Sequence, residues 1–144
     1  MRYSILAIVP VIVLSAGCRN STERDVQAGS AVTSQVHRGA RVFADNCASC
    51  HGDAGQGARG PRLVGPGAFP LNPRPEQHLR QQPFRTAADV AHFVTRNMPP
   101  DAEARREMSQ DEYWAVLAFA LDANGVELEE PLGPRTAGSI VLNR

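Results

Sequence analysis

The chain has 144 residues, of which 42% are hydrophobic and 21% are charged, and its 15 basic and 15 acidic side chains cancel to zero net charge. We expect a chain of this length to form one compact domain with short segments at its ends. The balanced charge disfavours nucleic acid as a partner, because phosphate binding requires clustered positive charge. All 15 basic residues are arginine, which excludes a Walker A phosphate loop and lysine Schiff-base chemistry.

The first 18 residues have the pattern of an export signal. Arg2 precedes an apolar stretch at residues 5–14, and small residues lead up to Cys18. The stretch is shorter than the roughly 20 residues that a transmembrane helix needs. The run Leu14-Ser-Ala-Gly-Cys18 resembles a bacterial lipobox, although its leucine stands one position too far from the cysteine. We therefore expect a periplasmic protein anchored to the membrane by a lipid on Cys18. The alternative is an ordinary signal peptide that leaves a free thiol.

The next segment, residues 19–34, is polar, rich in small side chains and aperiodic. This composition is typical of a flexible tether, so we expect no secondary structure there. The folded domain is predicted over residues 35–126. A C-terminal extension at residues 127–144 follows it, and its composition does not indicate whether it covers the domain or binds a partner.

The first predicted helix covers residues 36–46, where apolar residues recur every three or four positions. It ends at the motif Cys47-Ala-Ser-Cys50-His51. Two cysteines at this spacing can form thioether bonds to two vinyl groups on one porphyrin edge, and the histidine that follows can bind the iron. The motif predicts one covalently attached haem c at Cys47 and Cys50, with His51 as an axial iron ligand.

Two other roles of a Cys-x-x-Cys pair fit this sequence poorly. A zinc site needs a second pair of ligands, and the third cysteine of the chain, Cys18, lies in the export signal. A thioredoxin-like dithiol needs a β-α-β setting, and no segment shows the alternation of a strand. Covalent haem remains the prediction.

Longer runs around the motif carry a family resemblance. They are Gly39-Ala-Arg-Val-Phe43-Ala-Asp-Asn-Cys47-Ala-Ser-Cys50-His51-Gly52, Gly60-Pro61-Arg62-Leu63 and Asn97-Met98-Pro99-Pro100. Over residues 36–126 the chain resembles a class I cytochrome c domain. It is most similar to small bacterial cytochromes associated with quinoprotein (PQQ-dependent) dehydrogenases.

The resemblance implies an all-α cytochrome c fold, with three or more helices wrapped around one covalently bound haem. It implies that the Pro61 carbonyl accepts a hydrogen bond from His51, which makes the iron-bound nitrogen more electron-donating. It places Leu63 among the haem-binding residues, and it implies that Gly39 meets Phe119 where the first and last helices cross.

The middle helix is predicted to begin after Thr86, which can form a capping box with Asp89. Met98 follows this helix, and the prolines after it favour extended backbone that presents its side chain on a loop. Since this is also the place of the family's Met-Pro ligand, we expect Met98 to be the sixth iron ligand. Met108 is expected to pack in the interior, and nothing in the sequence directs His78 towards the haem.

The last helix is predicted to begin after Ser109, which can form a second capping box with Glu112, and to stop at Asn124-Gly125.

Basic and acidic residues are unevenly divided: residues 52–100 hold six arginines and three acids, whereas residues 101–130 hold nine acids and two arginines. The arginines either steer an acidic redox partner to the haem edge, or they are solvated on loops or paired with the haem propionates.

His/Met ligation favours ferrous iron and a positive reduction potential. The expected function is therefore that of an electron carrier, not an enzyme, between a periplasmic dehydrogenase and a respiratory acceptor such as an oxidase. The alternative is a haem enzyme or gas sensor in which the sixth ligand can be displaced.

Overall fold

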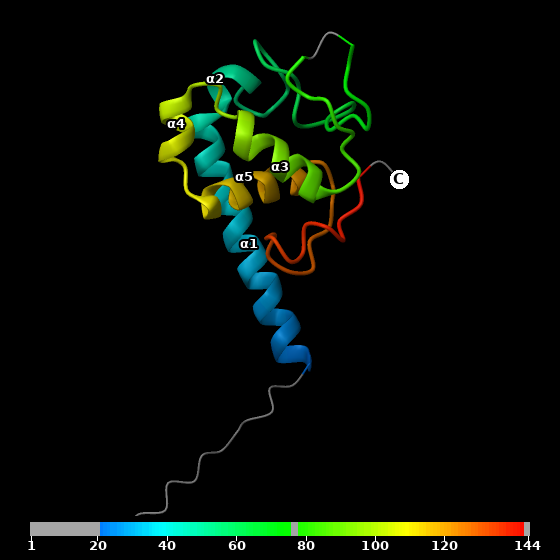
Figure 1. The fold of residues 1–144 in the computed structure, drawn as a ribbon. Coiled ribbons are helices and arrows are strands. Elements are labelled where there is room, and N and C mark those ends of the chain that lie inside the picture. The colour runs from blue at the N-terminus through cyan, green and yellow to red at the C-terminus, as the bar shows by residue number, and fades with distance from the viewer. Residues whose placement is uncertain (1–20, 76–77, 143–144) are drawn as a thin grey trace, which may run out of the picture.

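The computed structural model of the protein describes residues 21–75 and 78–142. Across these residues it contains helices and no strand, with one isolated antiparallel bridge between Thr86 and Val141. The helices are α1 (Ser21–Asn46), α2 (Ala48–His51), α3 (Ala87–Asn97), α4 (Ala102–Glu107) and α5 (Gln110–Asp122), and Figure 1 shows their arrangement. The predicted all-α class is confirmed. The predicted export signal and Cys18 lie outside the described residues.

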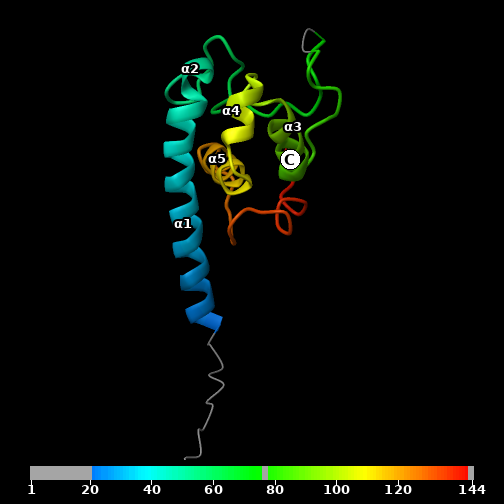
Figure 2. The ribbon, with the colours of Figure 1, turned by 60° about the vertical axis from the view of Figure 1, so that its left-hand side comes forward.

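Helix α1 is longer than predicted, and the expectation of an unstructured tether at residues 19–34 is wrong from residue 21 onward. The part before Gln35 is largely exposed and projects from the body of the protein (Figures 1 and 2). Residues 21–60 contain no proline. The helix can therefore extend from its packed part towards the N-terminus, because each added residue forms one more backbone hydrogen bond. Apolar periodicity does not predict such a segment, because an exposed helix has no buried face that requires regularly spaced apolar residues. None of the described helices combines the length and the hydropathy needed to cross a membrane.

Helices α1 and α5 cross closely at Gly39. A Cβ atom at this position would lie 1.9 Å from the carbonyl oxygen of Ala115 and 2.9 Å from the Cβ of Phe119, so only glycine fits. The Phe119 ring packs beside that of Phe43, with 5.3 Å between the ring centroids. The predicted pairing of Gly39 with Phe119 is confirmed. Helix α3 packs against α5 as well.

Both predicted capping boxes are present. In α3 the Thr86 hydroxyl accepts from the Asp89 backbone N–H, and the Asp89 carboxylate accepts from the Thr86 N–H at 2.8 Å. Ser109 and Glu112 make the same pair of bonds at the start of α5. The short helix α4 was not predicted. It begins after Asp101, whose carboxylate accepts hydrogen bonds from the backbone N–H groups of Glu103 and Ala104.

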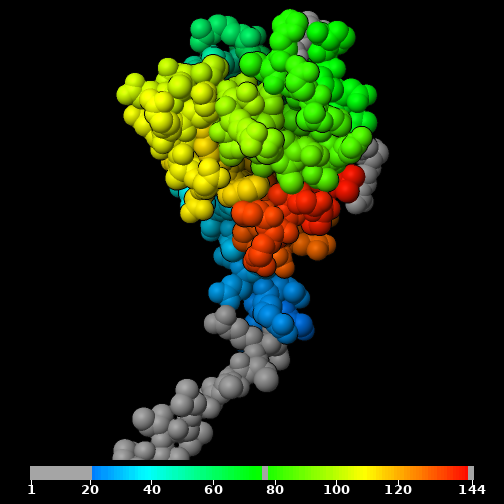
Figure 3. Space-filling model, viewed as in Figure 1, coloured from blue at the N-terminus to red at the C-terminus, as the bar shows by residue number. Residues whose placement is uncertain are grey.

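The C-terminal extension packs onto the domain. Its residues Leu132, Ala137 and Leu142 are buried in the same apolar cluster as α3 and α5. The Gln35 side chain exchanges two hydrogen bonds with the backbone of Leu132, at 2.8 and 2.7 Å. Figure 3 shows the extension lying against the green loop residues of the body. Residues 127–142 therefore complete the core and are not a separate appendage.

Candidate functional site

A cavity of about 620 Å³ lies within the body of the protein, in the size range of cofactor sites. Its walls come from the end of α1, from α2, from the loops on either side of residue 70, and from α3 and α5. All six residues predicted to bind the cofactor border it: Cys47, Cys50, His51, Pro61, Leu63 and Met98. Its apolar lining includes Phe43, Phe69, Val90, Phe93 and Leu117. The structure thus brings together residues that are far apart in the sequence.

The histidine segment, residues 47–51, forms a single helical turn. The backbone N–H of His51 donates to the Cys47 carbonyl at 2.9 Å, which continues the helical pattern through α2. Because residues three and four apart share a helix face, both thiols and the imidazole reach the same cavity. Burial, and after it the neighbouring Cys50, raises the pKa of the Cys47 thiol from 9.0 to about 11. Before the thioether bond to haem forms, this burial favours the uncharged form of the Cys47 thiol.

The orientation of the His51 ring is fixed by the loop that follows. His51 is buried, and its Nδ1 lies 2.7 Å from the Pro61 carbonyl oxygen, the contact that the family resemblance implies. A carbonyl only accepts, so Nδ1 carries the proton and Nε2 keeps its lone pair free to bind a metal. At Gly60 a Cβ atom would lie 2.9 Å from His51 Cε1. The loop can approach the ring this closely because residue 60 has no side chain.

Met98 enters the cavity from the end of α3. Its backbone is extended, with φ −126° and ψ 140°, as expected for a residue before proline. Its N–H still donates to the Val94 carbonyl at 2.8 Å, so the residue is tied to the last turn of the helix. Val94 borders the cavity as well. The structure thus places Met98 at the same cavity as Cys47, Cys50 and His51.

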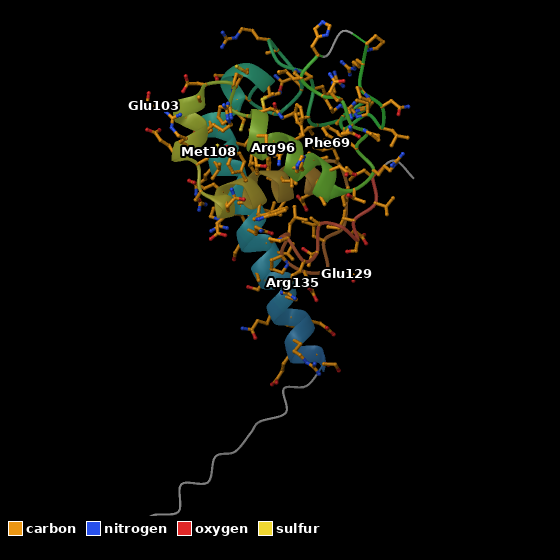
Figure 4. All side chains as sticks on the ribbon, viewed as in Figure 1. Phe69, Arg96, Glu103, Met108, Glu129 and Arg135 are labelled. Atoms are coloured by element: carbon orange, nitrogen blue, oxygen red, sulfur yellow. The ribbon has the colours of Figure 1, made fainter. Side chains whose placement is uncertain are left out.

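Two further candidates for the sixth ligand also border the cavity. Met108 is buried and packs with Val42 and Tyr113, as expected of an interior residue. It lies directly after α4 (Figure 4) and lines the cavity as well. His78 is exposed but contributes to the cavity rim, a position that the sequence did not indicate. No sequence signal marks either position, because both depend on how long loops fold.

Arginines form part of the cavity wall. Four of the six arginines in residues 52–100 border it: Arg59, Arg62, Arg74 and Arg80. Arg80 is only 4% exposed, and its guanidinium lies over the Phe84 ring at 4.1 Å. It donates to the backbone carbonyls of Leu71 and Asn72. Burial, followed by the charge of Arg74, lowers its pKa.

The residues present fit a covalently bound haem. They supply two thiols for thioether bonds, an imidazole nitrogen and a thioether sulfur for iron, and guanidinium groups for carboxylates. They do not fit zinc, because no three His, Cys, Asp or Glu side chains of the described residues converge into a metal site.

Comparison with known proteins identifies the family. The family model described as "Cytochrome C oxidase, cbb3-type, subunit III" matches residues 34–119. No curated protein and no solved structure matches the chain. The family description names a subunit of an oxidase, and for this chain the match establishes the type of domain. Since the match covers more than half of its residues, the chain belongs to this family, as an all-α c-type cytochrome domain that binds haem c covalently and carries electrons.

Proposed function

We propose that this protein is an exported electron carrier whose haem iron is ligated by His51 and Met98. The observation that supports the ligand pair is the shared cavity: His51 borders it beside Cys47 and Cys50, and Met98 borders it from the end of α3. When bound, the haem supplies an iron that gains and loses one electron. The residues around it then determine its reduction potential and which molecules reach it.

Each ligand has a distinct effect on the redox equilibrium. The Pro61 carbonyl, 2.7 Å from His51 Nδ1, keeps the other ring nitrogen unprotonated and electron-donating. The thioether of Met98 is a soft ligand and favours ferrous iron, which raises the reduction potential relative to two nitrogen ligands. Apolar side chains such as Val90 and Phe93 line the cavity, and an apolar lining limits the access of water to a bound group. This combination suits a carrier of single electrons at positive potential.

Redox proteins are the proposed partners: a periplasmic dehydrogenase, of the quinoprotein class by the resemblance of the sequence, as donor, and an oxidase or another respiratory protein as acceptor. The arginines at the cavity support docking to an acidic surface, because an exposed haem edge bordered by Arg59 and Arg62 would attract negative charge. Electron transfer with such a partner should slow as salt rises.

The proposed location is the periplasmic face of a membrane, with a lipid on Cys18. Support for it comes from the lipobox-like run before Cys18. Two or more acyl chains would hold the protein stably on the membrane. Labelling cells with a radioactive fatty acid tests this proposal, with Cys18→Ser as the matched control. A wild-type protein without label would contradict it.

The ligand assignment is tested by replacing one methionine at a time in the holoprotein. Met98→Ala should lower the reduction potential and let carbon monoxide bind the reduced iron rapidly, because a ligand position opens. Met108→Ala is the matched control, since Met108 borders the same cavity but should leave the iron six-coordinate. An unchanged potential and slow carbon monoxide binding in Met98→Ala would remove Met98 from this role. Rapid binding to the wild-type protein would favour a gas sensor or haem enzyme.

A further inference from the structure

The loop that follows α3 has an unusual set of hydrogen bonds. We define the methionine loop as residues 98–101, between α3 and α4. The Tyr113 hydroxyl, on α5, donates to the Met98 carbonyl at 2.8 Å. The Nη1 of Arg105, on α4, lies 2.5 Å from the Pro99 carbonyl oxygen, 3.0 Å from that of Pro100 and 3.5 Å from that of Asp101. Two side chains thus contact four consecutive carbonyl groups.

The composition of the loop explains why side chains are needed there. Pro99 and Pro100 have no N–H groups, so the loop has few backbone donors, and the partly buried carbonyl groups of Met98 and Pro99 must find other partners. Tyr113 is 4% exposed, so its hydroxyl donates to the Met98 carbonyl largely away from water. This hydroxyl also lies 3.2 Å from the backbone carbonyl oxygen of Arg105, so both residues belong to one network around the loop.

The network connects directly to the cavity. Met98, Pro99, Pro100 and Tyr113 all line it, whereas Arg105 contacts the loop from outside. A thioether binds iron only while its backbone stays in place, and a loop fixed at four carbonyls loses less freedom when the sulfur binds. Releasing the carbonyls should therefore weaken the sulfur–iron bond without removing the sulfur.

We propose that Tyr113 and Arg105 are positioning residues that hold the methionine loop and so determine how readily a competing ligand displaces Met98. This inference rests on the proposed ligation by Met98. It assigns neither residue a contact with the iron. Its signature is a change in ligand exchange at the iron while haem attachment at Cys47 and Cys50 stays complete.

The test uses the purified holoprotein and imidazole as the competing ligand. The variants are Tyr113→Phe, which removes one hydroxyl, and Arg105→Gln, with Arg105→Lys as the conservative replacement. The matched control is Arg106→Gln, because Arg106 is an exposed neighbour on α4. Imidazole affinity of the ferric protein is measured by absorbance titration, with the reduction potential as a second readout. The thermal unfolding temperature shows whether each variant is folded.

We expect Tyr113→Phe and Arg105→Gln each to raise imidazole affinity about 5- to 10-fold, the fold-change that corresponds to losing one hydrogen bond, and to lower the potential. Arg105→Lys should restore part of the difference, and Arg106→Gln should match the wild type. Met98→Ala should bind imidazole most tightly. Wild-type affinity in both positioning variants, with tight binding in Met98→Ala, would overturn the positioning role alone. Wild-type affinity in Met98→Ala would overturn the ligation and the positioning role with it.

Discussion

The two segments that carry the proposed iron ligands of this cytochrome are held in different ways. The histidine segment is built from neighbours: His51 follows Cys50 in one helical turn, and its ring is fixed by Pro61, ten positions away in the chain. The methionine loop depends on residues of other helices, since the hydrogen bond to the Met98 carbonyl comes from the hydroxyl of Tyr113, fifteen positions away on α5. The residues for haem attachment are therefore close together in the sequence, whereas the loop that carries the proposed second ligand depends on helix packing.

The largest expected effect comes from disrupting the scaffold that both regions share. Gly39→Ala would place a Cβ atom 1.9 Å from the Ala115 carbonyl oxygen, so α1 and α5 must separate. We expect a loss of about 3 kcal/mol in the free energy of unfolding, with weaker ligation from both regions. Denaturant unfolding of the holoprotein measures it.

Gly29→Ala is the matched control for this scaffold prediction. Gly29 lies on the projecting part of α1, and a Cβ atom there would have nothing within 4 Å. Alanine at an exposed helical position should stabilise by up to about 1 kcal/mol. Equal effects of the two substitutions would contradict the tight crossing at Gly39.

A smaller effect should separate the histidine segment from the methionine loop. Gly60→Ala would place a Cβ atom 2.9 Å from His51 Cε1 and 3.0 Å from Nδ1, which should lengthen the hydrogen bond to Pro61. A weaker bond makes the imidazole a poorer electron donor, so the reduction potential should rise by about 40 mV, equivalent to about 1 kcal/mol.

Imidazole affinity should remain at the wild-type value in Gly60→Ala, because the methionine loop is not touched. Potentiometric titration and imidazole binding, measured on the same preparation, check both outcomes. A fall in potential, or an increase in imidazole affinity like that expected of Tyr113→Phe, would show that the two regions are not independent.

An effect of similar size concerns the start of α3, the helix that precedes Met98. Hydrogen bonds from the backbone N–H of Thr86, and to a lesser extent of Arg85, lower the pKa of the Asp89 carboxyl. A depressed pKa in the folded state means that the charged form stabilises the fold. This contribution is present above the pKa of the unfolded chain, about 3.9, and is lost as the pH falls through the lower folded value.

Asp89→Asn should therefore cost about 1 kcal/mol at about pH 7, a modest value because the carboxylate is close to solvent. The difference from the wild type should shrink at about pH 2. Denaturant unfolding at both pH values measures it, with Asp53→Asn as a control on an exposed loop carboxylate. A difference that does not depend on pH would contradict the charged cap.

Much of the helical framework could be read from short patterns. The capping boxes at Thr86 and Ser109 depend on residues three positions apart, so their geometry follows from the sequence alone. The close contact between Gly39 and Phe119 was predicted through the family resemblance. The projecting half of α1 was missed because it buries no apolar stripe, and α4 because a helix of six residues carries too little periodicity.

The sequence by itself determined the covalent haem site, because two thiols and an imidazole within five residues meet the requirements of the porphyrin through one turn of backbone. Only the tertiary structure decided which side chains surround Met98, that His78 and Met108 share its cavity, and that residues 127–142 close the core. The physical reason is the distance along the chain between the residues that interact. A helical turn is fixed by bonds between neighbours, whereas a cavity wall forms when segments far apart in the chain bury apolar surface against one another.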